Sequence, residues 1–118
     1  MKRVLCAATA ALILGVPGFA QAANYAPIDC AKAASAADRT ICGNYALGQA
    51  EARMATLYGV AMSLVAMGQR GDIGDAQKQW VAAREACGAN AACLIKAYDS
   101  RIDQLNKVIA GIASRGPY

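Results

Sequence analysis

Apolar residues recur at helical spacing through much of the chain. Between residues 44 and 65 they follow one another in steps of three and four: Leu47, Ala50, Met54, Leu57, Ala61 and Leu64, with Tyr58 and Val65 widening the stripe. This spacing predicts an amphipathic helix, and Asn44 is suited to cap its amino end. A shorter helix is expected before it, because Ser35 and Asp38 have the spacing of a capping box and Gly43 can end the helix.

Two more helices are predicted in the second half of the chain. Gln77, Trp80, Arg84 and Cys87 share one helical face, and Gly88 offers a stop. A last helix from about Asn90 would turn these residues inward: Leu94, Tyr98, Arg101, Ile102, Leu105, Val108 or Ile109, and Ile112. Residues 68–75 hold three glycines and several charges without periodicity, so we expect a loop there, with Asp72 or Asp75 capping the following helix.

The predicted fold class is all-α, because no segment shows a convincing alternation of apolar and polar residues with period two. Proline is absent between Pro27 and Pro117, and 23 of residues 23–118 are alanine, the strongest helix former. Short connections imply antiparallel neighbours. We expect a small disulfide-stapled domain of about three to four helices with a long antiparallel hairpin.

The amino end has the order of a secretory signal peptide. Met1–Arg3 carries two positive charges, an apolar run follows to Val16, and Ala20-Gln21-Ala22 provides small residues for cleavage. A membrane-spanning helix is disfavoured by Pro17 and Gly18, and a lipid anchor by the position of Cys6, which lies at the beginning of the apolar run instead of its end. We therefore predict a signal peptide at 1–22, a mature domain at 23–118 and a periplasmic or secreted protein without a stable membrane anchor.

Removal of residues 1–22 leaves four of the five cysteines. Four cysteines in a small exported domain favour two disulfides, for which three connectivities exist. Cys30 and Cys42 are 12 residues apart, and Cys87 and Cys93 are 6 apart, so local pairing is the leading interpretation. The alternative, a four-cysteine zinc site, is disfavoured because neither pair has the Cys-x-x-Cys spacing. We expect no metal and no cofactor.

Composition narrows the function further. The chain has no histidine, which removes the Ser/His and Cys/His nucleophilic pairs and histidine metal ligands. We therefore expect a protein that is not an enzyme. The chain has 12 Lys and Arg and 8 Asp and Glu, which are scattered along the sequence. A small net positive charge of this kind does not suggest a nucleic-acid binder.

Two arginines stand on the apolar stripes, Arg84 and Arg101. A guanidinium on an inward face needs a carboxylate or must keep its head in water. One interpretation is structural: an ion pair with Asp38, Glu51 or Asp103, or stacking on an aromatic ring. The other is that Trp80, Arg84, Tyr98 and Arg101 form a contact surface, because these residue types are enriched at interface hot spots.

The residues also resemble a known family. Gln77-x-x-Trp80-x-x-x-Arg84-x-x-Cys87, followed by Cys93-Leu94-x-x-x-Tyr98-x-x-Arg101-Ile102, is similar to the LprI-type lysozyme inhibitor domain, and the likeness covers residues 29–105. The resemblance implies a small helical exported domain that binds and inhibits a lysozyme, which is a muramidase, and so protects the cell wall. An envelope structural or adaptor domain with another protein partner is the alternative. If lysozyme is the partner, acidic side chains of residues 68–75, or a backbone edge there, are candidates to enter its cleft.

Overall fold

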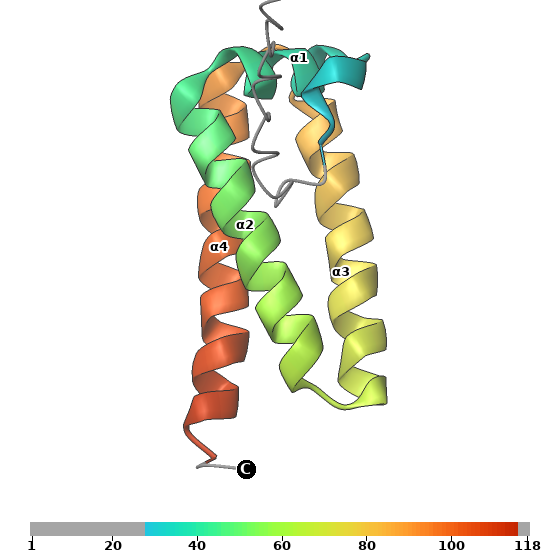
Figure 1. Cartoon of the computed structure of the whole chain (residues 1–118), viewed down its shortest axis with the longest axis vertical. Coiled ribbons are helices and arrows are strands. Elements are labelled where there is room, and N and C mark those ends of the chain that lie inside the picture. Colours follow the sequence, from blue (N-terminus) through green and yellow to red (C-terminus); the bar gives the residue numbers. More distant parts are fainter. Residues whose placement is uncertain (1–27, 116–118) are drawn as a thin grey trace, which may run out of the picture.

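The computed structural model describes residues 28–115 as a bundle of α-helices. A 3₁₀ turn, η1 (Cys30–Lys32), precedes α1 (Ala36–Gly43), α2 (Tyr45–Leu64), α3 (Met67–Ala86) and α4 (Ala91–Ala113). The three long helices alternate in direction, and α1 lies across one end of the bundle (Figure 1). The predicted all-α fold is therefore confirmed, and the described residues contain no strand. The predicted signal peptide lies outside the described residues and stays a prediction.

Three of the four helices begin at side-chain caps, two of them, Ser35 and Asn44, predicted from the sequence. The Ser35 hydroxyl accepts a hydrogen bond from the Asp38 amide at 2.9 Å, and the side-chain oxygens of Asn44 and Asn90 accept from Leu47 and Cys93 at 3.1 and 3.0 Å. Each bond satisfies an amide that has no partner within its own helix. The fourth helix, α3, begins after Ala66 without a side-chain cap.

The loop predicted at residues 68–75 is wrong, because these residues form the first turns of α3. The connection is instead the short segment Val65–Ala66, and neither Asp72 nor Asp75 caps a helix. Tertiary contacts favour the helix over the loop that three glycines suggest. Ile73 is buried, its carbonyl accepts a hydrogen bond from Arg101 at 3.3 Å, and Gly74 stands opposite the Tyr58 hydroxyl.

The core follows the predicted stripes with one exception. α2 and α4 form the most extensive helix–helix contact, and most of the residues predicted inward are buried: Leu47, Met54, Ala61, Leu94, Tyr98, Ile102, Leu105 and Ile112. Leu64, predicted on the same stripe, is 52% exposed, because α2 ends there and the next residue, Val65, turns inward.

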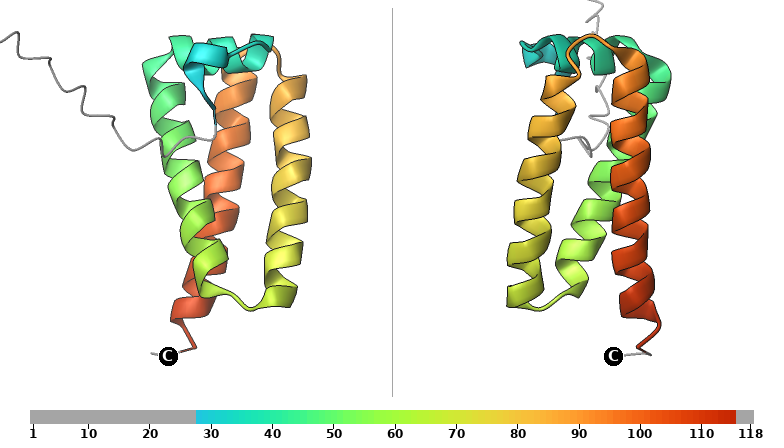
Figure 2. Two further views of the ribbon diagram at one scale, coloured as in Figure 1. Left: turned by 45° about the vertical axis from the view of Figure 1, so that its right-hand side comes forward. Right: turned by 180° about the vertical axis from the view of Figure 1, so that it is seen from behind.

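Both disulfides lie at the end of the bundle that α1 covers (Figure 2). Cys30 is bonded to Cys42 and Cys87 to Cys93, the local pairing predicted from the sequence. The second bond closes the α3–α4 turn, in which Gly88 has a φ of 55°. That left-handed conformation favours glycine because it has no Cβ.

None of the described helices combines the length and hydropathy that crossing a membrane requires.

Candidate functional site

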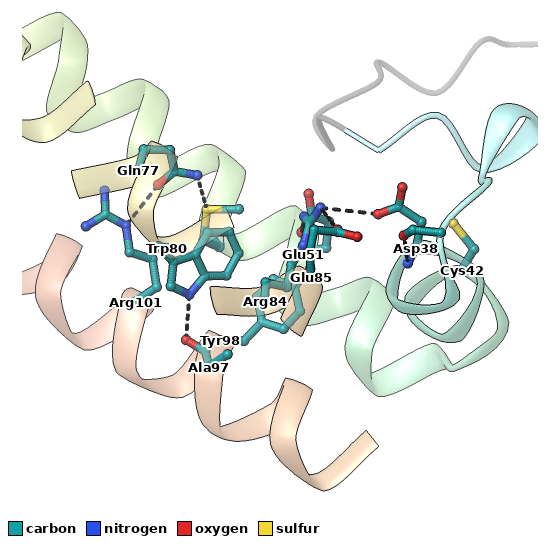
Figure 3. Close-up of polar contacts among 12 residues, drawn as sticks. Asp38, Cys42, Glu51, Gln77, Trp80, Arg84, Glu85, Ala97, Tyr98 and Arg101 are labelled. Carbon is teal, nitrogen blue, oxygen red and sulfur yellow. Dashed lines mark hydrogen bonds and ion pairs between the residues drawn. The ribbon is translucent and has the colours of Figure 1, made fainter. Parts of the chain in front are cut away.

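The structure brings together all five residues of the predicted motif. Gln77, Trp80 and Arg84 project from α3 toward Tyr98 and Arg101 of α4, in the space that α2 closes from the third side (Figure 3). Trp80 is 9% exposed, Arg84 5%, Arg101 4% and Tyr98 0%. The motif is therefore internal to the bundle.

Arg84 is the centre of an ion-pair network that joins three helices. Its guanidinium nitrogens lie 3.2 Å from Asp38 of α1, 3.4 Å from Glu51 of α2 and 2.8 Å from Glu85 of α3. Its guanidinium carbon also lies 5.6 Å from the centre of the Trp80 ring, within cation–π range. Asp38, Glu51 and the aromatic ring were among the partners considered from the sequence. Asp103 instead pairs with Lys107 at 2.7 Å.

Glu51 is the most deeply buried carboxylate of the network, with 1% exposure. Its Oε2 accepts hydrogen bonds from the Tyr98 hydroxyl and from Arg84, whereas its Oε1 is buried without a hydrogen-bond partner. Burial raises the pKa of Glu51, although the Tyr98 hydrogen bond and the Arg84 charge oppose the rise. Burial and the neighbouring Glu51 likewise raise the pKa of Tyr98.

The surroundings of Glu85 and Arg84 instead favour the charged form of each side chain. The hydrogen bond from Arg84 lowers the pKa of Glu85, which lies near the surface. Burial by itself lowers the pKa of Arg84, but the hydrogen bond to Glu85 and the charge of Glu51 outweigh it, so the pKa is raised. Arg84 therefore stays charged and holds the three carboxylates around it.

Sequence reasoning named Glu51 only as one possible partner of Arg84 and missed its central position. The signal was present, because Glu51 stands four residues after Leu47 and three before Met54, on the apolar stripe of α2. A carboxylate at such a position requires a cation or a hydrogen-bond donor nearby.

Arg101 forms a second cluster, in which all the hydrogen-bond acceptors are neutral. Its guanidinium donates to Gln77 at 2.9 Å, to Gln104 at 3.1 Å and to the Ile73 carbonyl at 3.3 Å. Among residues 28–115 no carboxylate pairs with it, and burial lowers the pKa of Arg101. The ion pair considered for Arg101 from the sequence is thus replaced by neutral oxygen acceptors.

Trp80 joins the two clusters. Its indole nitrogen donates to the Ala97 carbonyl at 2.8 Å, and its ring meets the Tyr98 ring edge-on, with centroids 5.2 Å apart. Large side chains thus fill the space between α3 and α4. The burial and internal pairing of these residues favour the structural interpretation of the motif over a contact surface.

A pocket of about 240 Å³ lies beside the ion-pair network, between the first helical segments and the start of α2. It is lined by Ile28, Cys30, Ile41, Cys42, Asn44, Tyr45, Gly48, Gln49 and Glu51.

Large apolar side chains are exposed at two ends of the molecule. At the disulfide end these are Tyr45, which is 84% exposed, and Ile95, which is 44% exposed. At the α2–α3 turn, Met67 is 80% exposed, Leu64 52% and Val60 39%. The acidic segment predicted to enter a partner's cleft lies in α3, and the helix ends that flank the turn present apolar side chains.

Comparison with protein families identifies a match. A family model described as "Lysozyme inhibitor LprI" covers residues 30–105, more than half of the chain. No curated protein and no solved structure shows significant similarity to the chain. The matched segment contains all four cysteines of the two disulfides and all five motif residues.

Proposed function

Because the chain belongs to the LprI lysozyme inhibitor family, we propose that it is an exported, non-enzymatic protein that binds and inhibits a lysozyme-like muramidase. The family match over residues 30–105 is the observation that carries this proposal. In the cell, such an inhibitor protects the wall that the muramidase would cut.

The sequence and the disulfides support export. Residues 1–22 have the pattern of a secretory signal peptide, and disulfides persist mainly in oxidising compartments. A periplasmic or secreted location would also place the protein where muramidases attack the wall.

The architecture suits binding by a folded surface that needs no partner to order it. The two disulfides fix one end, and the buried Arg84 network joins α1, α2 and α3. A protein that is already ordered loses little conformational freedom on association. Inhibition by covering a substrate cleft requires only such a surface and no cofactor.

Net charge affects how the partners meet. Residues 23–118 carry 10 basic and 8 acidic side chains, a balance of +2. Such a balance gives no long-range attraction to a basic muramidase, so contacts at short range must supply the affinity.

A turbidity assay tests the proposal. The oxidised mature protein, residues 23–118, is added to a bacterial cell suspension with muramidases of several structural classes, and direct binding is measured by calorimetry. We expect slower lysis in proportion to the added protein, and a complex with at least one class.

The control is the same protein with the muramidase replaced by a wall-cutting amidase, which an inhibitor of glycoside hydrolysis should leave active. Failure to inhibit or bind any muramidase at micromolar concentration would contradict the proposal and favour an envelope adaptor domain.

A further inference from the structure

Four exposed side chains flank the α2–α3 turn. Val60 and Leu64 are four residues apart near the end of α2, and Met67 and Arg70 are three apart at the start of α3, so each pair lies on one helical face. We call these four residues the hairpin tip. Its apolar members are between 39% and 80% exposed.

The hairpin tip lies at one end of the bundle, where the carboxyl end of α4 also lies (Figure 1). The turn consists of only Val65–Ala66, and it lies at the end of the bundle opposite α1 and both disulfides (Figures 1 and 2). Exposed large apolar residues at the end of a narrow bundle suit insertion into a concave partner.

The charge of the hairpin tip is positive. The Arg70 side chain is exposed and has no ion pair or hydrogen bond among residues 28–115. The nearest acid in sequence, Asp72, is two residues further along α3 and therefore points to the other side of the helix. The amino end of α3, which has no side-chain cap, adds a partial positive charge at the same place.

These features match the substrate cleft of a muramidase. Most glycoside hydrolases place two carboxyl groups on either side of the bond they cut, at the floor of a concave site. Apolar side chains at the end of a narrow bundle, beside an unpaired guanidinium, suit such a cleft in size and in charge. Leucine, methionine and arginine can there be buried together, with the guanidinium paired to a carboxylate.

We propose that the hairpin tip is the surface that enters the muramidase cleft, with Leu64 and Met67 against its walls and Arg70 toward its carboxylates. The proposal rests on the proposed function and names its contact residues. It places them at the end of the molecule opposite the buried motif, so the motif shapes the bundle and the hairpin tip binds.

The test compares matched surface variants of the mature protein. The hairpin-tip variants are Leu64→Ser with Met67→Ser, and Arg70→Glu. The controls change the same residue types at the disulfide end: Tyr45→Ser with Ile95→Ser, and Lys96→Glu. All of these side chains are exposed, so the melting temperatures should stay close to that of the wild type.

We expect each hairpin-tip variant to weaken muramidase binding and inhibition by about tenfold or more, as central interface residues do, and the controls to change them by less than about twofold. A soluble N-acetylglucosamine oligosaccharide that occupies the cleft should compete with the wild-type protein for the enzyme. Arg70→Gln should weaken muramidase binding less than Arg70→Glu does, because it removes the attraction to the carboxylates without adding repulsion.

The outcomes separate the two proposals. If the wild type inhibits and the hairpin-tip variants inhibit equally well, or if the oligosaccharide does not compete, the hairpin tip is not the contact surface and the proposed function stands. Absence of inhibition by the wild type overturns the proposed function itself, and the assignment of the hairpin tip with it. A dimer that the hairpin-tip variants dissociate without loss of inhibition would make the surface a self-association site and would also overturn the assignment.

Discussion

At the scale of single residues, the buried network has more acids than bases. Asp38, Glu51 and Glu85 surround one guanidinium, that of Arg84. Three ionised carboxylates exceed the charge that one arginine can balance, which agrees with the raised pKa of Glu51, the most buried of them. Arg84 and Glu51 therefore depend on each other.

Replacement of Arg84 by alanine should destabilise the protein strongly at neutral pH. It leaves Glu51 buried without its cation, and breaking a buried pair on one side costs about 3 to 5 kcal/mol. Urea unfolding measures the loss. Arg53→Ala on the exposed side of α2 is the control and should cost less than about 0.5 kcal/mol.

If Arg84→Ala lowered the free energy of unfolding as much in acid as at neutral pH, this account of the variant would be contradicted. Below the ordinary pKa of a glutamate, 4.5, Glu51 takes up a proton and no longer needs the cation.

Glu51→Gln should make the protein relatively more stable as pH rises. A carboxyl whose folded pKa is raised contributes stability that is complete below its ordinary pKa of 4.5 and is lost as pH rises through the folded pKa. Glutamine has no charge to bury, so the melting temperature of the variant minus that of the wild type should increase from pH 4 to pH 8.

Glu85→Gln provides the opposite sign for comparison. The pKa of Glu85 is lowered in the folded protein, so its contribution is present above 4.5 and is lost as pH falls through the folded pKa. If the melting-temperature differences of the two variants changed with pH in the same direction, burial would not determine the pKa of Glu51.

At the scale of helices, α3 is the element whose intrinsic preference and observed structure disagree. Gly68, Gly71 and Gly74 lie in its first turns, and each glycine inside a helix costs about 1 kcal/mol relative to alanine. The burial of Ile73 and the hydrogen bond that its carbonyl accepts from Arg101 hold these turns against that cost.

Gly71→Ala should therefore stabilise the protein, by up to about 1 kcal/mol. No atom lies within 4 Å of the place a Cβ would take, so the substitution meets no obstacle. Thermal unfolding measures the gain. Gly88→Ala is the counterpart: its φ of 55° is unfavourable for alanine, so a loss of about 1 to 2 kcal/mol is expected. Destabilisation by Gly71→Ala would mean that these turns are not helical.

At the scale of the whole molecule, stability is concentrated at the disulfide end. Cys30–Cys42 ties η1 to α1, and Cys87–Cys93 closes the turn between α3 and α4. The opposite end has only the short α2–α3 turn and glycine-rich helix, so the hairpin tip should open more easily than the α1 end. Hydrogen exchange should be faster at residues 67–71 than at residues 94–102.

Removal of the first disulfide tests this distribution. Cys30→Ser with Cys42→Ser should lower the free energy of unfolding by about 2 to 3 kcal/mol, the value for a loop of this length. Protection from hydrogen exchange should fall most in α1, and protection at the hairpin tip should change little. Equal loss of protection at both ends would show that the bundle opens only as one unit.

The sequence by itself determined the features that depend on neighbours a few residues away. These are the helical class, the caps Ser35 and Asn44, the left-handed glycine after α3, the inward stripe of α4 and the local disulfide pairs. Each follows from a backbone amide, a φ angle or a short loop, so the residue types within that span suffice to predict it.

Only the tertiary structure decided where α3 begins, why Leu64 is exposed and which acids surround Arg84. Residues 68–75 are a poor helix in isolation, and contacts from α2 and α4 make them helical. Asp38 and Glu51 stand 46 and 33 residues before Arg84 in the chain. Such partners meet only after the helices pack, because the burial that makes their charges interact strongly is itself a product of packing.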